Sequence, residues 1–361
     1  MKAKSLVINP LKNEVYFEDK EINDSNSSGQ TIKWDISCVC ASERRRFNKQ
    51  KSHSDLTPFV AGHESVGLIK GNKNLHVLLP HSNCITRGDK IMCSSCKEGS
   101  YNLCKCMNHA GLASSEPGGL SQLSVVPNAQ LLECKDLDPE LAVFTEPLSC
   151  VIRSWKKTSE CNKQKIGIIG LGPIGCLHFL YGKIVCPDSE FYLFEENQNR
   201  VEMFNKAFKE YGYFMNENIS DLDFTIMANS LSSGFEKSKA CLKTDGSLLL
   251  FSGFNEVTYN DKGLFPEFIH REEFNFYDDE IFLFGSSGYQ REDLEDSMLM
   301  LKENPQFMKI VTGKVYGIDS VTLHSVYTED QFFENPVLIE DISGNLSNHI
   351  KIQYHVNESE K

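Results

Sequence analysis

Residues 165–175 read KIGIIGLGPIG. The isoleucines of its first half form a short, apolar, β-branched run, which is typical of a buried parallel strand. The second half has the spacing G-x-G-x-x-G at Gly170, Gly172 and Gly175. The first glycine allows a tight turn, the second lets a pyrophosphate approach the backbone, and the third lets a helix pack closely on the strand. Pro173 suits the first position of that helix, whose free N–H groups attract phosphate. The segment therefore predicts a dinucleotide-binding strand, turn and helix.

An acidic residue follows the next predicted strand, 191–194, at the place where a dinucleotide fold uses a carboxylate. Glu195 would accept hydrogen bonds from the adenosine ribose and would repel a 2′-phosphate, and the first arginine after it is Arg200. NAD is therefore favoured over NADP. The alternative is an ordinary glycine turn beside a solvated acidic loop. The predicted cofactor-binding residues are Gly170, Gly172, Pro173, Ile174, Gly175, Glu195 and Arg200.

Composition limits the class of protein. The chain has 361 residues, enough for two domains, and 40% hydrophobic and 24% charged residues are typical of a globular protein. A net charge of −13 argues against nucleic acid or an anionic membrane as partner. No apolar run is long enough to span a membrane, and the first residues lack an apolar signal core. The 13 unevenly clustered cysteines indicate a reducing compartment, so we expect a cytoplasmic protein that acts on a small molecule.

The pattern of predicted elements changes twice along the chain. The first 150 residues show short β-type runs, an alternation of strands and helices begins at residue 165, and the last fifty residues return to β-type runs. We expect one domain of residues 1–150 completed by 300–361, and a second of residues 151–299. Outside the strands named above, we expect strands at 31–39, 88–92, 122–126, 223–227, 247–251, 281–284, 337–342 and 349–356. The expected helices are 141–155, 199–211, 234–242 and 291–303.

Several motifs occur together in an order that one family shares. They are Cys40-x-Ser, Gly62-His63-Glu64, Gly88-Asp89, the cysteines 93, 96 and 104, Glu146-Pro147-Leu148 and GLGPIG. From about residue 32 to about residue 352, the chain resembles the zinc-dependent medium-chain dehydrogenases, most of all their sorbitol and polyol dehydrogenase branch. The resemblance implies a Rossmann doubly wound parallel sheet beside a GroES-like β-barrel catalytic domain. It also implies NAD, zinc and a homodimer or homotetramer.

The resemblance implies a catalytic zinc held by Cys40, His63, Glu64 and Glu146. These are donor types that zinc accepts, and such a site keeps one position open for a substrate oxygen. We expect Cys40 and His63 to bind directly, and Glu64 or Glu146, or both in exchange with water, to complete the site. Taken alone, the pair His63-Glu64 could equally be a hydrogen-bonded core pair.

Two further motifs adjoin the zinc cysteine. Ser42 stands where the family has the hydroxyl that passes the substrate proton outward, but Arg45 stands where a relay histidine is often found. Arg44, Arg45 and Arg46 form either a solvated loop or a clamp for an anionic group such as phosphate. The presence of an arginine near this place is also similar to the ketose-phosphate reductases, which generally lack the cysteine lobe. The final proton acceptor therefore stays open.

The cysteine lobe repeats three of the family's four structural zinc positions, at Cys93, Cys96 and Cys104. Lys90 stands where the first ligand is expected, so Cys106 or Cys84 could supply the fourth sulfur, and we predict Cys106. The alternative is a zinc-free lobe of reduced thiols.

The predicted function is hydride transfer between NAD(H) and a secondary alcohol or ketone of a polyol, sugar or cyclitol, with or without a phosphate group. The alternatives are the same fold acting on an amino alcohol or a simple alcohol, and a paralogue that binds NAD or zinc without turnover.

Overall fold

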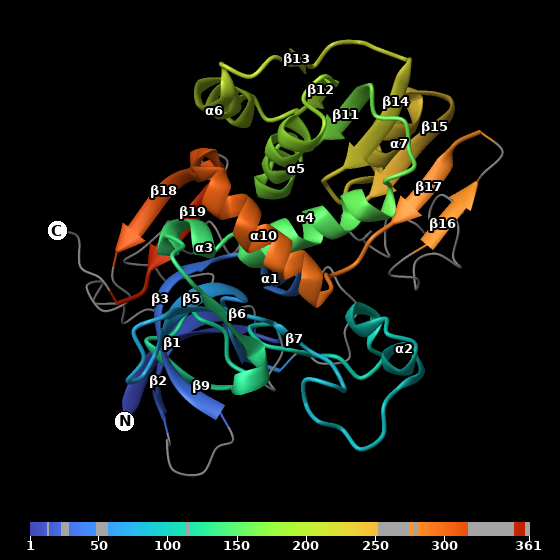
Figure 1. Cartoon of the computed structure of the whole chain (residues 1–361). Helices are drawn as coiled ribbons and strands as arrows, with labels where there is room; N and C mark the ends of the chain where they lie inside the picture. Colours follow the sequence, from blue (N-terminus) through green and yellow to red (C-terminus); the bar gives the residue numbers. More distant parts are fainter. Residues whose placement is uncertain are drawn as a thin grey trace. The chain divides into compact units, whose positions relative to one another are not determined.

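The computed structural model describes residues 1–12, 14–22, 29–47, 57–112, 116–251, 274–277, 280–316 and 350–357 (Figure 1). The chain divides into two compact units. The first consists of Met1–Glu146, Met298–Leu346 and Ile352–Lys361, and the second of Pro147–Ser297 and Ser347–Lys351. Among the described helices, none is long and apolar enough to cross a membrane.

The second unit is built on a seven-stranded sheet with the order β13-β12-β11-β14-β15-β17-β16. All neighbouring pairs are parallel except β16–β17. The strands are β11 (Lys165–Ile169), β12 (Glu190–Phe194), β13 (Phe214–Met215), β14 (Leu222–Met227), β15 (Leu242–Leu250), β16 (Phe274–Tyr277) and β17 (Phe282–Gly285). The central strands are apolar on both faces, which is why they are buried as a parallel sheet.

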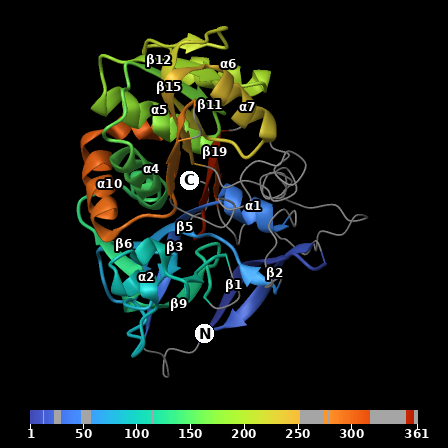
Figure 2. The same ribbon diagram turned by 90° about the vertical axis from the view of Figure 1, so that its right-hand side faces the viewer.

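The strand order of this sheet reverses between β11 and β14, so the crossover helices lie on its two faces. Helix α5 (Pro173–Val185) follows β11, α6 (Gln198–Phe208) follows β12, and α7 (Ser232–Ala240) follows β14. Figure 2 shows α5 and α7 on opposite sides of the sheet. This reversal is the doubly wound arrangement that the sequence predicted, and sheets of this kind bind their ligands at the carboxyl ends of the strands beside the reversal.

The first unit is mostly β-structure. A curled seven-stranded sheet has the order β10-β6-β5-β3-β19-β18, with β9 paired to β3, and a three-stranded sheet has the order β2-β1-β4 (Figure 1). The strands of the larger sheet are β3 (Gly29–Cys38), β5 (Glu64–Ile69), β6 (Leu75–Leu78), β9 (Leu123–Pro127), β10 (Leu131–Cys134), β18 (Val311–Tyr316) and β19 (Lys351–His355). Those of the smaller sheet are β1 (Lys2–Asn9), β2 (Glu14–Glu21) and β4 (Phe59–Val60).

The core of the first unit joins both ends of the chain. Ile32 and Trp34 of β3 pack in one buried cluster with Leu6 of β1 and with Ile352 and Tyr354 of β19. Tyr354 pairs with Ser37 of β3, so a strand from the C-terminal region completes a sheet begun in the N-terminal region. The return of the chain to its first unit explains why β-type patterns lie on both sides of the α/β region.

The predicted fold class is confirmed, and several elements match closely. Strand 165–169 and helix 291–303 (α10, Arg291–Glu303) have the predicted bounds. Helix 141–155 is divided into α3 (Pro139–Ala142) and α4 (Thr145–Lys157). The predicted strand 337–342 lies outside the described residues. The predicted strand 88–92 is wrong, because these residues follow a turn that positive φ at Gly88 helps to form.

Candidate functional site

Three side chains of the first unit bring metal-donor atoms together. Cys40 precedes helix α1 (Ala41–Phe47), His63 precedes β5, and Glu64 begins β5. Their sulfur, imidazole nitrogen and carboxylate oxygen all lie within 4.8 Å of one another. His63 and Glu64 are buried, whereas Cys40 is half-buried. A soft sulfur, an imidazole and a carboxylate in one cluster are a donor set that fits a catalytic zinc ion.

Glu43 supports this group and was missed by sequence reasoning. Its fully buried carboxylate accepts hydrogen bonds from the backbone N–H of Cys40 (2.8 Å), Gly62 (2.5 Å) and His63 (3.2 Å). The same carboxylate lies 3.3 Å from Nδ1 of His63. One side chain therefore ties together the two segments that carry Cys40 and His63, which fixes the positions of two donors.

The charges around His63 favour a cation. Burial alone would lower the pKa of His63, but the Glu43 carboxylate and the Cys40 sulfur beside it hold this pKa well above its ordinary value. The same two groups would stabilise the positive charge of a bound metal ion, and the His63 imidazole would then be neutral. The electrostatics of the cluster thus agree with its donor chemistry.

Ser42 and Arg45 lie on α1 beside the metal group. The Ser42 hydroxyl is 3.9 Å from the Cys40 sulfur, and Nη2 of Arg45 donates to this hydroxyl at 3.4 Å. In the part of the chain that the structure describes, Nε of Arg45 has no hydrogen-bond partner. Burial lowers the pKa of this guanidinium, and the Cys40 sulfur partly offsets that effect. In contrast, the Arg46 guanidinium packs over the ring of Phe59, 5.3 Å from its centroid.

Glu146, the fourth predicted ligand, lies in the first turn of α4 and is buried. It is not among the three donors that lie within 4.8 Å of one another. Its place at the metal therefore stays a prediction.

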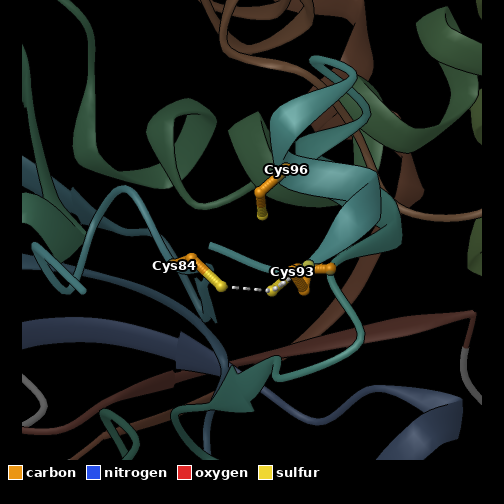
Figure 3. Close-up of side chains that lie close together, drawn as sticks. Cys84, Cys93 and Cys96 are labelled. Carbon is orange, nitrogen blue, oxygen red and sulfur yellow. Dashed lines mark hydrogen bonds between the residues drawn. The ribbon is translucent and has the colours of Figure 1, made fainter. Parts of the chain in front are cut away.

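Four cysteine sulfurs form a second metal-donor group, at Cys84, Cys93, Cys96 and Cys104. Figure 3 shows the side chains of Cys84, Cys93 and Cys96 pointing toward one another. The Cys104 sulfur lies 3.6 Å from that of Cys84 and 3.8 Å from that of Cys93. A tetrahedral zinc ion with Zn–S bonds of about 2.3 Å separates its sulfurs by about 3.8 Å, so the spacing fits a structural zinc ion. All four thiols are free.

The structure brings Cys84, and not the predicted Cys106, to this group. Cys106 is exposed and lies outside it. Arg87 holds the loop after Cys84 in place, because its guanidinium donates to the Ser82 carbonyl, pairs with Asp89 at 2.5 Å and lies 3.7 Å from the Cys84 sulfur. The chain turns directly after Cys84, because the Asp89 N–H donates to the Cys84 carbonyl at 2.9 Å.

The thiols of this group differ in their readiness to lose a proton. A hydrogen bond from the Cys96 backbone N–H lowers the pKa of Cys93 to about 6. Burial raises the pKa of Cys96 to about 12. A metal ion would be needed to hold both as thiolates at neutral pH, and zinc binding does this.

The glycine turn of the second unit has the geometry that a dinucleotide needs. Gly170 has φ +95°, and a Cβ on Gly175 would lie 1.9 Å from the Gly170 carbonyl oxygen, so both positions require glycine. A Cβ on Gly172 would meet nothing within 4 Å. The backbone at Gly172, which caps α5, is therefore open to an approaching phosphate, and Pro173 begins the helix as predicted.

Glu195 and Arg200 lie next to this turn. The Glu195 carboxylate accepts from the backbone N–H of Leu171 and of Asn197, each at 2.9 Å, and lies 3.5 Å from Nη1 of Arg200. Glu195 thus joins the turn to the start of α6. A carboxylate has about four acceptor positions, so it can still accept from a ribose hydroxyl.

Comparisons with known proteins agree with this architecture. Residues 28–136 match the family model of the alcohol dehydrogenase GroES-like domain. L-galactonate-5-dehydrogenase of Escherichia coli is 24% identical over 184 residues, which are 48% of this chain and 52% of that protein. D-xylulose reductase A of Aspergillus oryzae is 30% identical over 124 residues, 33% of this chain and 34% of that protein. The chain spans about half, or less, of the length of these curated relatives.

Solved structures match over nearly the whole chain. L-idonate 5-dehydrogenase from Escherichia coli has a TM-score of 0.71 at 18% identity, and the match covers 98% of each chain. Galactitol-1-phosphate dehydrogenase from Escherichia coli has a TM-score of 0.73 at 17% identity, with 98% of this chain and 99% of that chain covered. The chain therefore contains an alcohol dehydrogenase GroES-like domain within a medium-chain dehydrogenase fold, which confirms the resemblance to the zinc-dependent medium-chain dehydrogenases.

Proposed function

We propose that this chain is a zinc-dependent oxidoreductase that transfers a hydride between NAD(H) and a secondary alcohol or ketone of a polyol, sugar or cyclitol. The observation that carries the proposal is the clustering of Cys40, His63 and Glu64 within 4.8 Å, with Glu43 bonded to the segments of Cys40 and His63. Relatives named for L-galactonate, L-idonate and D-xylulose support the substrate class.

In this proposal Cys40, His63 and Glu64 hold the catalytic zinc, and Glu146 is a further candidate ligand. A zinc ion there would act as a Lewis acid that lowers the pKa of the substrate hydroxyl. Ser42, whose hydroxyl can both accept and donate, takes up the proton that this hydroxyl releases. Arg45 shares a hydrogen bond with Ser42 and holds it in place.

The glycine turn holds the cofactor. The start of α5 and the open backbone at Gly172 receive the pyrophosphate, and Glu195 accepts from the adenosine ribose. We propose NAD over NADP because the Glu195 carboxylate would repel a 2′-phosphate. Arg200, already paired with Glu195, supports that carboxylate.

Arg45 also suggests that the substrate carries an anionic group. Among the described residues, no carboxylate pairs with the Arg45 guanidinium, whose partial burial is therefore costly, and a substrate carboxylate or phosphate would offset that cost. Two of the relatives are named for sugar acids, and one structural neighbour for a sugar phosphate. We further propose the cytoplasm as its compartment, which its 13 free cysteines support, and a homodimer or homotetramer as its assembly.

The test is NAD reduction, and NADH oxidation in the reverse direction, followed at 340 nm with a panel of substrates. The panel contains xylitol, sorbitol, myo-inositol, an aldonic acid, a ketose and its phosphate, threonine and 2-butanol. We expect turnover of at least one polyol, sugar acid or ketose, and its loss in Cys40→Ser. Turnover of threonine or 2-butanol alone would favour the amino-alcohol or simple-alcohol alternative. The absence of any turnover, with NAD and zinc bound, would indicate the non-catalytic alternative.

A further inference from the structure

An asparagine at the end of a central strand has no role in the site described so far. Asn229 follows β14 by two residues, and β14 is a parallel neighbour of β11. The N–H of the preceding residue, Ala228, donates to the Ile169 carbonyl at 2.9 Å, so the two strands end next to each other. Asn229 therefore lies at the carboxyl edge of the sheet, where a doubly wound fold binds its ligand.

Two glycines make room for the Asn229 side chain. A Cβ on Gly170 would lie 3.1 Å from the Cβ of Asn229 and 3.4 Å from its Nδ2, so this side chain packs directly on the first glycine of the cofactor turn. A Cβ on Gly234, in the first turn of α7, would lie 2.8 Å from the Asn229 Cγ, which is too close for any residue but glycine. The amide is thus held between the cofactor turn and the start of α7.

One hydrogen bond fixes the orientation of this amide. The Leu231 N–H, at the N-cap of α7, donates to Oδ1 of Asn229 at 3.2 Å. Because a backbone N–H needs an acceptor, the contact assigns the oxygen to the side of α7 and leaves the NH2 group beside Gly170. Among the described residues, none accepts from this NH2 group, and Asn229 is only half-buried. Two N–H donors at the cofactor turn therefore remain for a ligand.

The position of these donors indicates which part of a dinucleotide they meet. Glu195 approaches the turn from β12, on one side of β11, and bonds the Leu171 N–H. Asn229 approaches the same turn from β14, on the other side of β11. The pyrophosphate of a dinucleotide lies over such a turn, with the adenosine ribose next to it. The oxygens of both groups accept hydrogen bonds, and those from N–H groups to a charged phosphate are among the stronger ones.

We propose that Asn229 is a cofactor-binding residue whose NH2 group donates to an oxygen of the ADP half of the cofactor, a phosphate oxygen or a ribose hydroxyl. Asn229 and Glu195 then hold this half from the two neighbours of β11. Their chemistry is complementary, because the carboxylate accepts hydrogen bonds from the cofactor and the amide donates to it. This inference rests on the proposed function and adds a residue to its cofactor site.

The test measures the binding of AMP, ADP and NADH to the full-length protein by isothermal titration calorimetry, without substrate. In Asn229→Ala, which lacks the donor, the dissociation constants of ADP and NADH should rise by the same factor of about 5 to 10. An equal loss with AMP would locate the contact at the ribose or its phosphate, and no loss with AMP would locate it at the second phosphate. A loss with NADH alone would place the contact in the nicotinamide half and overturn the inference.

Asn229→Asp separates the donor from a merely structural role. The carboxylate can still accept from the Leu231 N–H, and its charge is favourable at the start of α7, so the unfolding temperature without ligand should not fall. ADP should nevertheless bind about 10-fold more weakly or worse, because the donor is lost and a charge faces the phosphates. Repulsion between charges is screened by salt, whereas the missing donor is not restored. The ratio of the variant's dissociation constant to that of the wild-type protein should therefore stay at about 5 or more in high salt.

Asn205→Ala is the matched control. Asn205 is an exposed asparagine on α6 of the same unit, and its Oδ1 also accepts one hydrogen bond, from the Tyr213 hydroxyl at 2.7 Å. This variant should bind all three nucleotides like the wild-type protein.

Three results are distinguishable. Weaker ADP binding in both Asn229 variants, persisting in high salt in Asn229→Asp, supports the inference. Wild-type affinity in Asn229→Ala, or in Asn229→Asp at high salt, overturns it while leaving the proposed function intact. If the wild-type protein itself binds neither ADP nor NADH, the cofactor of the proposed function is wrong and the inference falls with it.

Discussion

The buried carboxylate of Glu43 offers the sharpest test of how the metal group is held. In Glu43→Gln the shape of the side chain is kept, but one of its two oxygens becomes an NH2 group. The best arrangement keeps the oxygen toward the N–H groups of Gly62 and His63 and turns the NH2 toward the N–H of Cys40. That backbone donor then faces another donor in a partly buried place.

The magnitude follows from these contacts. Leaving this partly buried N–H unpaired costs about 1–3 kcal/mol, and replacing two charge-assisted hydrogen bonds by neutral ones costs about 1 kcal/mol each. We therefore expect Glu43→Gln to lower the free energy of unfolding of the first unit by about 4 kcal/mol. Because the two donor segments would be less well fixed, zinc affinity should fall by about 10- to 100-fold.

Urea unfolding of the metal-free protein, followed by tryptophan fluorescence, measures the first quantity, since Trp34 lies in the core of this unit. Competition with a chromophoric chelator measures the second. Glu18→Gln is the control, because the Glu18 side chain is half exposed on β2 and its loss should change stability by less than about 0.5 kcal/mol. If Glu43→Gln matched this control in both assays, the positioning role of Glu43 would be refuted.

Three other predictions concern separate parts of the chain. Cys84→Ser should reduce bound zinc from two ions per chain to one, whereas Cys106→Ser should retain both ions. Metal analysis of the purified variants measures this, and equal zinc contents would contradict Cys84 as the fourth sulfur ligand. Gly172→Ala should fold normally, because its Cβ meets nothing within 4 Å, but a fluorescence titration should show weaker binding of NADH. Gly175→Ala should bind NADH more weakly and also lose thermal stability, because its Cβ would lie 1.9 Å from the Gly170 carbonyl oxygen. Burial lowers the pKa of His178 to about 3, below its unfolded value, so the unfolded state binds the extra proton and stability falls as the pH falls. Between pH 6.5 and pH 5 the loss should be about 2 kcal/mol in urea unfolding and absent in His178→Gln; an identical slope in that variant would show that other groups titrate.

The dinucleotide fold could be predicted because its signals are local. The strand at 165–169, the glycines and Pro173 all lie within eleven residues, and their geometry depends on the backbone of that segment alone. The resemblance to the zinc-dependent medium-chain dehydrogenases likewise implied Cys40, His63 and Glu64, which the fold brings together through the long-range pairing of β3 with β5.

The supporting residues could not be predicted, because their roles depend on tertiary contacts. Glu43 precedes three arginines and reads as part of a solvated loop, yet it faces inward from the short helix α1. Cys84 is separated from Cys93 by a loop whose fold depends on Arg87, so sequence spacing alone did not identify it as the fourth sulfur.

The proposal that zinc at Cys40, His63 and Glu64 drives NAD-linked oxidation is tested most directly by metal replacement. The protein is stripped with a chelator and zinc is added back in steps, while bound zinc and NADH formation at 340 nm are measured on the same samples with the best panel substrate. We predict that the stripped wild-type protein is inactive, that activity returns in proportion to the zinc bound at this group, and that Cys40→Ser recovers none. Full activity of the zinc-free protein, or recovery in Cys40→Ser equal to that of the wild-type protein, would contradict the proposal.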